Sequence, residues 1–94
     1  MDFKISRGND KTVIEIKLTS NQNCVHGIEV QIEEYAKAEC TKNKIFVLVD
    51  NGINSRQSSA VEQKRDAMIK RGKKPADLFV IDAKPKKPAS KYKK

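Results

Sequence analysis

A short run of alternating residues, Thr12–Leu18, sets two opposite charges into a pattern typical of a β-strand. Side chains alternate across a strand, so Glu15 and Lys17 share one face with Val13. Three aliphatic side chains share the other face, which we expect to contact the core: Ile14, Ile16 and Leu18. The charged face presents a carboxylate and an ammonium about 7 Å apart along the strand.

Two interpretations of the Glu15–Lys17 pair are open. In the first, the pair lies on the solvated side of a half-buried strand, as antiparallel sheets often have. In the second, the carboxylate holds a divalent metal and the lysine contacts a water or a phosphate oxygen. The pair alone does not distinguish these two interpretations, so the neighbouring parts of the sequence have to be considered.

The run before this strand predicts the other half of a β-hairpin. Asp2–Ser6 alternates weakly, and turn-forming residues follow it directly. A two-residue turn at Gly8–Asn9 would set Asp2 opposite Glu15, whereas a turn one residue later would set it opposite Lys17. The sequence leaves both registers open.

In either register Asp2 shares a face with Glu15 and Lys17, and only a three-residue loop would reverse this. Two carboxylates that face each other across strands repel, and a bound cation relieves the repulsion. Asp10 is the rival acid, but it lies at the turn, where Asp is common because it hydrogen-bonds to nearby backbone.

A helix is expected from about Val25 to Cys40, because apolar residues recur there at helical spacing. Its inner stripe consists of Val25, Ile28, Ile32, Tyr35 and Ala36. Gln31 and Tyr35 are four residues apart, so their polar ends lie on one side of the helix. His26, at the start of the helix, is interpreted as a surface or capping residue rather than a ligand.

A strand over Lys44–Asp50 follows, and its continuous apolar run suits a central position buried on both faces. A second helix is expected from a cap at Ser58 or Ser59 to about Arg71, and a last strand over Leu78–Ile81. A β-hairpin followed by helix–strand–helix–strand predicts one α/β domain over residues 2–82, a mixed sheet with helices packed against it.

The net charge of +8 is concentrated at the end of the chain, where six lysines occupy the last eleven residues and leave about +2 for residues 1–83. We predict that residues 83–94 form a basic disordered tail, which can attract a polyanion. Cys24 and Cys40 are too few for a disulfide framework, and the helix between them separates them by about 24 Å. Reduced thiols, without a signal peptide or membrane span, indicate a cytoplasmic protein.

Three features in this order resemble the PD-(D/E)XK (restriction-endonuclease-like) nuclease superfamily. They are the acid Asp2, the strand Val13–Lys17 with its Glu-x-Lys, and a following helix that carries Gln31-x-x-x-Tyr35. The resemblance is to the Gln/Tyr-helix branch, as in lambda-exonuclease-like and RecB-type nucleases. The longer string from Glu15 to Asn21 also resembles C-terminal domains of larger uncharacterised bacterial proteins.

By this resemblance Asp2 and Glu15 would ligate Mg²⁺ or Mn²⁺, with the carbonyl oxygen of Ile16 as a further ligand. Lys17 would position the attacking water or help to deprotonate it. Oxygen ligands suit a hard cation, and such a cation lowers the pKa of its water and stabilises charge on a phosphate. The implied activity is that of a metal-dependent nuclease acting on nucleic-acid phosphodiesters.

Gln31 and Tyr35 would steady that site or contact the phosphate backbone of the substrate. The polymer would be nucleic acid, with DNA favoured over RNA. Five basic residues of the second helix and the segment after it would contact phosphates: Lys64, Lys70, Arg71, Lys73 and Lys74. The alternative is a non-catalytic nucleic-acid-binding or structural interaction module on the same fold.

The sequence departs from the superfamily pattern at its start. The superfamily core has a helix and a strand before the first acid, whereas this sequence begins one residue ahead of Asp2. We therefore expect a restriction-endonuclease-like core that lacks its first helix and strand. The missing elements would come from the remainder of a longer parent chain or from a second subunit.

Overall fold

The computed structural model describes the backbone of residues 2–7 and 10–85 and the side chains of residues 11–85. Its elements in chain order are β1 (Asp2–Arg7), β2 (Asp10–Leu18), α1 (Cys24–His26), the π-helical turn η1 (Gly27–Gln31), α2 (Ile32–Ala38), β3 (Lys44–Asp50), α3 (Gln57–Lys70) and β4 (Asp77–Asp82). The predicted tail from Lys86 onward lies outside the described residues, as does the side chain of Asp2.

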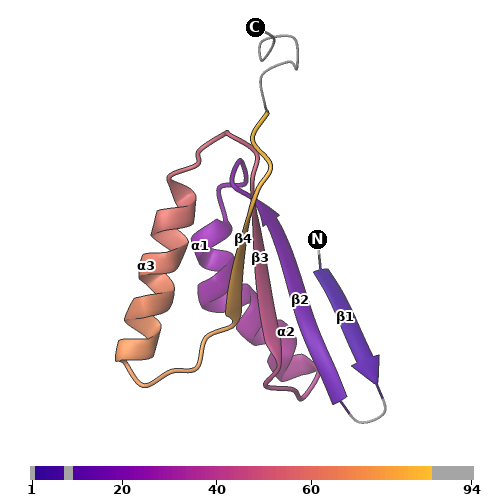
Figure 1. Ribbon diagram of the computed structural model, residues 1–94. Coiled ribbons are helices and arrows are strands. Elements are labelled where there is room, and N and C mark those ends of the chain that lie inside the picture. The colour runs from indigo at the N-terminus through magenta and orange to yellow at the C-terminus, as the bar shows by residue number, and fades with distance from the viewer. Residues whose placement is uncertain (1, 8–9, 86–94) are drawn as a thin grey trace, which may run out of the picture.

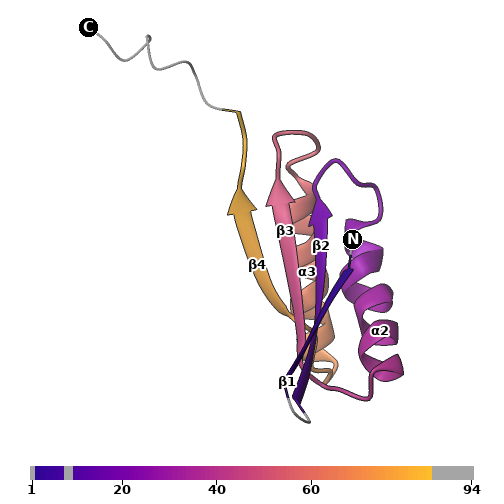
Figure 2. The ribbon, with the colours of Figure 1, turned by 90° about the vertical axis from the view of Figure 1, so that its right-hand side faces the viewer.

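Within this part of the chain, the strands form one mixed sheet in the order β1-β2-β3-β4 (Figures 1 and 2). β1 is antiparallel to β2, while β2, β3 and β4 run parallel to one another. The predicted α/β class, with a β-hairpin followed by helix–strand–helix–strand, is confirmed.

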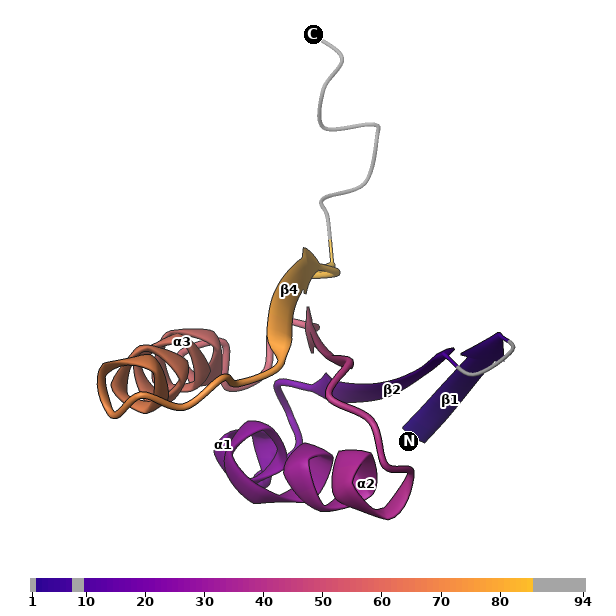
Figure 3. The ribbon, with the colours of Figure 1, turned by 90° about the horizontal axis from the view of Figure 1, so that it is seen from below.

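Both helical segments lie on the same side of the sheet, as the view from below shows (Figure 3). The reason is the handedness of the connections. A crossover between parallel strands is right-handed in nearly all proteins. Two such crossovers that step across the sheet in the same direction, β2 to β3 and β3 to β4, place their helices on one face. The other face of the sheet has no helix over it within the described residues.

The core face of β2 is the opposite of the predicted one. Val13, Glu15 and Lys17 are buried under the helices, whereas Ile14 and Ile16 are half-buried. The core combines side chains from β2, β3 and the helices: Val13, Cys24, Ile28, Ile32, Ala36, Phe46, Leu48, Val61 and Ala76. The predicted alternation within β2 is present, but alternation does not indicate which face a helix will cover.

The central strand β3 has the predicted bounds and lies between β2 and β4. Its predicted burial on both faces is wrong. Phe46 and Leu48 are buried against the helices, while Ile45, Val47 and Val49 are half-buried on the uncovered face.

The first helix runs without a break through α1, η1 and α2, in agreement with the predicted helix apart from its π-helical turn. The predicted cap of the second helix is wrong, because α3 begins at Gln57 and both Ser58 and Ser59 lie inside it. The Gln57 amide donates hydrogen bonds to the carbonyl oxygens of Thr19 and Asn21, so a tertiary contact holds the start of this helix beside the end of β2.

Cys24 and Cys40 are both free thiols, the first buried and the second exposed. None of the described helices is long and apolar enough to span a bilayer.

Candidate functional site

Glu15 and Lys17 form a buried ion pair on the helix-covered face of β2. Their side chains are 2 % and 9 % exposed, and Lys17 Nζ lies 3.4 Å from Glu15 Oε2. The interpretation of this pair as the solvated side of the strand is therefore wrong. Removing two charges from water costs several kcal/mol per ion, and their mutual attraction offsets this only in good geometry. A pair buried at this cost indicates a specific structural or functional role.

The hairpin register places Asp2 directly opposite Glu15. Arg7 and Asp10 form the last described pair, and this register is one of the two that the sequence predicted. Asp10, the rival acid, lies five residues from Glu15 along β2, or about 17 Å, which removes it from the candidate site.

Gly27, which the sequence analysis did not assign to the site, makes room for the lysine. A Cβ atom at this position would lie 3.1 Å from Lys17 Cε and 2.9 Å from Cε1 of the buried Phe46 ring. The signal in the sequence was a glycine inside an amphipathic helix pattern, where glycine costs about 1 kcal/mol relative to alanine. Its place in the structure shows why a side chain is excluded there.

The π-helical turn starts at Gly27 and includes Gln31, four residues later on the same side of the helix. The Ile32 amide donates to the Gly27 carbonyl oxygen, which is the π-helical spacing, and single π-turns recur at functional sites. Gln31 Oε1 is buried and accepts no hydrogen bond from the described residues. A buried amide oxygen without a donor costs about 1–3 kcal/mol, so this atom is available to a water, a ligand or a cation.

Tyr35 lies on α2, four residues beyond Gln31, and its side chain is exposed. His26 is exposed at the end of α1, in agreement with its interpretation as a surface residue.

A surface hollow of about 480 Å³ adjoins the buried pair. It is lined by Ile16, Lys17, Leu18, Ser20 and Asn21. Its β2 residues lie beyond the Asp2–Glu15 pair, where the described pairing of β1 with β2 ends. Lys17 and Ile16 are therefore the residues of the candidate site that line this hollow.

Cys24 packs close to this site but is not a candidate nucleophile or ligand. Burial raises the pKa of its thiol, and the nearby positive charge of Lys17 only partly opposes this. The thiol donates to the carbonyl oxygens of Leu18 and Asn21, each at 3.1 Å. Cys24 thus stays protonated at neutral pH and fastens the loop after β2.

Among the side chains that the structure describes, no group of three or more His, Cys, Asp or Glu side chains could hold a metal ion. The predicted ligand set of Asp2, Glu15 and the Ile16 carbonyl does not depend on such a group. That set consists of the Glu15 carboxylate, the Ile16 carbonyl oxygen and the carboxylate of Asp2, whose side chain lies outside the described residues.

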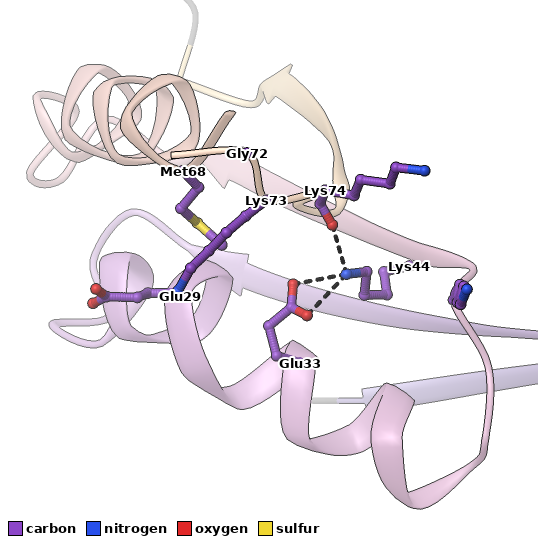
Figure 4. A pocket seen from close by; sticks show the side chains of 8 residues that line it. Glu29, Glu33, Lys44, Met68, Gly72, Lys73 and Lys74 are labelled. Atoms are coloured by element: carbon purple, nitrogen blue, oxygen red, sulfur yellow. Dashed lines mark hydrogen bonds and ion pairs between the residues drawn. The ribbon is translucent and has the colours of Figure 1, made fainter. Parts of the chain in front are cut away.

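The predicted phosphate-binding residues lie elsewhere, on α3 and the segment that follows it. Lys64 forms an ion pair with Glu29 at 3.2 Å, and Lys70 and Arg71 are exposed at the end of α3. Lys73 and Lys74 line a hollow of about 640 Å³ between α3 and the first helix, shown in Figure 4. The structure therefore does not bring this basic group to the Glu15–Lys17 pair.

The hollow in Figure 4 contains acids as well as lysines. Lys44 Nζ lies 2.8 and 2.9 Å from the two carboxylate oxygens of Glu33 and donates to the Lys74 carbonyl oxygen at 2.7 Å. Glu29 also lines it. The hollow therefore presents acidic as well as basic side chains.

A family model with the description Domain of unknown function (DUF8371) matches residues 1–53. These residues include the hairpin, the Glu15–Lys17 pair and the whole first helix, and they exclude α3 and β4. No curated protein and no solved structure matches the chain.

Proposed function

We propose that this chain, which belongs to the family described as Domain of unknown function (DUF8371), is a metal-dependent nuclease-like domain acting on nucleic-acid phosphodiesters. The observation that carries the proposal is the buried Glu15–Lys17 pair, set opposite Asp2 in the hairpin and beside a helix with a buried, unsatisfied Gln31 oxygen.

The donor atoms suit a hard cation. Glu15 would supply a carboxylate and Ile16 a backbone carbonyl, and Mg²⁺ or Mn²⁺ prefers oxygen ligands. Directly opposed residues of an antiparallel pair share a sheet face, so the Asp2–Glu15 register is compatible with this ligand set. Such a cation, when bound, lowers the pKa of a coordinated water and stabilises charge on the scissile phosphate.

Lys17 has the features expected of an electrostatic donor. Its stem passes through the gap left by Gly27, beside the ring of Phe46, so the ammonium is held by packing rather than being free to rotate. Its nitrogen lies 3.4 Å from the Glu15 carboxylate, and Lys17 also lines the open hollow. In this position Lys17 would orient a water or neutralise a phosphate oxygen as negative charge develops.

The second candidate is a non-catalytic nucleic-acid-binding or interaction module on the same fold. One observation favours it: Lys17 already neutralises Glu15 at 3.4 Å, so the pair has a structural role without any metal. A divalent cation would have to compete with this ammonium for the carboxylate. Metal-dependent cleavage separates the two candidates.

The test is a cleavage assay with Mn²⁺ or Mg²⁺ on single- and double-stranded DNA and RNA, with the 94-residue chain and with the complete protein of its reading frame. We expect cleavage that is abolished by chelation, by Glu15→Gln and by Lys17→Met. Glu34→Gln and Lys37→Met are matched controls, because both residues are exposed on α2 outside the site. Circular dichroism of each variant tests whether it is folded.

An NMR titration with Mg²⁺ gives a readout that does not depend on turnover. We expect amide shifts at residues 2, 15–17 and 31–35 that Glu15→Gln abolishes. The affinity should be weak, because Mg²⁺ sheds water reluctantly and usually binds through one or two carboxylates plus substrate phosphate. Nucleic-acid binding that is independent of metal and insensitive to Glu15→Gln, without cleavage, would favour the non-catalytic module.

A further inference from the structure

The hollow beside Lys17 is lined by the end of β2 and by the loop that follows it. Its volume of about 480 Å³ lies within the range of about 300–1,000 Å³ that small-molecule sites have. Its lining includes one lysine and no acid, whereas two glutamates line the hollow in Figure 4. An anionic group that enters the hollow beside Lys17 therefore meets no like charge in the lining.

The side chain of Asn21 leaves a hydrogen-bond donor available in this lining. Its Oδ1 atom accepts a hydrogen bond from the Asn23 backbone amide at 2.8 Å, and this contact fixes which end of the side chain is the oxygen. The Nδ2 group carries two hydrogens, and among the described residues it has no acceptor. Asn21 is exposed, so a ligand can reach this group.

The hydroxyl of Ser20 is also left as a donor. Asn51 Oδ1 accepts from the Ile53 backbone amide at 3.2 Å, so Nδ2 of Asn51 is the group that donates to Ser20 Oγ at 3.1 Å. Because Ser20 Oγ accepts this hydrogen bond, its own O–H remains to donate to another group. No acceptor for it lies among the residues that the structure describes.

Backbone acceptors of the same loop are already engaged by internal donors. The Leu18 carbonyl oxygen accepts from the Asn21 amide at 2.9 Å and from the Cys24 thiol at 3.1 Å. The Gln57 side-chain amide donates to the carbonyl oxygens of Thr19 and Asn21. The side-chain groups that remain available along the lining are therefore donors, which suits an anion with several acceptor oxygens.

We propose that this hollow binds one phosphate group of a nucleotide unit. The Ser20 hydroxyl, the Asn21 Nδ2 group and the Lys17 ammonium donate to the phosphate oxygens. Lys17 already lies 3.4 Å from Glu15, but an ammonium has three hydrogens and can serve both partners. Hydrogen bonds to a charged group are about twice as strong as those between neutral groups.

The apolar part of the lining favours a nucleotide over free phosphate. Leu18 is 46 % exposed and Ile16 is half-buried, so the donors have an apolar surface beside them. A sugar or base that covers Leu18 removes this surface from water, whereas inorganic phosphate does not. The inference rests on the proposed function and extends it, because it assigns Ser20 and Asn21 to the binding of the nucleic-acid substrate.

The experiment is an NMR titration of the isotope-labelled 94-residue chain, without metal, with thymidine 5′-monophosphate, inorganic phosphate and thymidine. We expect the monophosphate to give saturable shifts of the backbone amides of residues 17–21 and of the Asn21 side-chain amide. Inorganic phosphate should shift the same signals but bind about tenfold more weakly, because it does not cover Leu18. Thymidine, which lacks the phosphate, should leave the Asn21 side-chain amide unshifted.

Asn21→Asp tests the donor most directly. It keeps the Oδ1 atom that accepts from the Asn23 amide but replaces the donor with a carboxylate oxygen, so it should raise the dissociation constant of the monophosphate by at least about tenfold. Gln63→Glu is the matched control, because it makes the same amide-to-acid change at an exposed position of α3. It should leave the dissociation constant unchanged.

A second pair of variants tests the hydroxyl. Ser20→Ala removes both the donor and the acceptor of the Asn51 amide, whereas Ser20→Thr keeps the hydroxyl. We expect weaker binding of the monophosphate in Ser20→Ala and recovery in Ser20→Thr. Equal loss in both variants would overturn the assignment of the hydroxyl as a phosphate donor.

The outcomes separate this inference from the proposed function. Three results would overturn the inference: no saturable shift with the monophosphate, equal affinity for inorganic phosphate and the monophosphate, or equal weakening by Asn21→Asp and Gln63→Glu. The last result would mean that binding follows net charge alone. Binding with the expected pattern of variants, in a chain that cleaves no nucleic acid, would support the phosphate site and reject the nuclease activity.

Discussion

Lys17 reaches Glu15 because the helix above the pair carries a glycine where any other residue would place a side chain. At the scale of single residues, the candidate site therefore depends both on the Glu15–Lys17 pair and on the absence of a side chain at Gly27. The following two predictions separate these contributions.

We expect Gly27→Ala to destabilise the domain. The added methyl would lie 2.9 Å from the Phe46 ring, and overpacking of this kind costs about 1–3 kcal/mol. The gain in helix propensity, about 1 kcal/mol, offsets part of this cost. Urea unfolding measures the difference. The double variant with Gly27→Ala and Phe46→Leu should lose less unfolding free energy than the sum of the two single losses, because the smaller side chain makes room for the methyl. Strictly additive losses would mean that the ring and the methyl are not in contact.

We expect Lys17→Met to cost about 3–5 kcal/mol, the usual cost of removing one partner from a buried ion pair. Methionine keeps most of the stem that passes Gly27, so the loss is chiefly electrostatic. The double change Glu15→Gln with Lys17→Met should recover much of the stability, since it removes the buried negative charge together with the ammonium. A double-mutant cycle in urea measures this coupling, and a coupling energy near zero would mean that the pair is not an energetic unit.

At the scale of elements, the carboxyl ends of β2 and β3 are joined by a polar network around Asp50. Its carboxylate accepts hydrogen bonds from the Ser55 hydroxyl at 2.7 Å and the Gly52 amide at 3.0 Å, and Lys84 Nζ lies 3.8 Å away. These contacts, the Ser55 hydrogen bond first, hold the pKa of Asp50 below its usual range. The network fixes the loop between β3 and α3.

The lowered pKa predicts a pH dependence with a definite sign. The unfolded chain binds a proton at Asp50 near the ordinary pKa of about 3.9, whereas the folded chain does so only at lower pH. The stability that Asp50 contributes is therefore present above about pH 4–5 and is lost as the pH falls through the lowered folded pKa.

Asp50→Asn should remove that contribution. We expect the loss of stability between pH 7 and pH 3, measured by urea unfolding, to be smaller in Asp50→Asn than in the unmodified chain. Asp66→Asn is the matched control, since Asp66 is an exposed acid on α3. Equal pH dependence in the two variants would contradict the role of Asp50.

At the scale of the whole molecule, we expect that the lysine-rich end of the chain can be removed without loss of the fold. Five of the lysines that make up the net charge of +8 lie between Lys86 and Lys94, beyond the last strand. We expect deletion of residues 86–94 to leave the melting temperature unchanged and to flatten the salt dependence of nucleic-acid binding. The slope should fall by about one unit for each phosphate that the shortened chain no longer binds, measured by fluorescence anisotropy. An unchanged slope would assign the phosphate contacts to residues 2–85.

The sequence alone determined the local structure of this protein well. The strand over Lys44–Asp50, the hairpin and the common face of Glu15 and Lys17 all followed from alternation and turn residues, because these depend on neighbours in the chain. The sequence also narrowed the hairpin register to two values, of which the structure adopts the one that pairs Asp2 with Glu15.

Only the tertiary structure decided which side of the sheet became the core. Alternation shows that β2 has two faces but does not show which of them the helices cover. The face with three aliphatic residues had the stronger apolar pattern and was therefore predicted to contact the core. Right-handed crossovers on both sides of β3 put both helices on the face of Glu15 and Lys17 instead. That choice buried an ion pair whose burial the sequence had left open, made Gly27 necessary, and left an apolar sheet face that no helix of the described residues covers. The sequence of one strand could not show this, because handedness is a property of the connected chain.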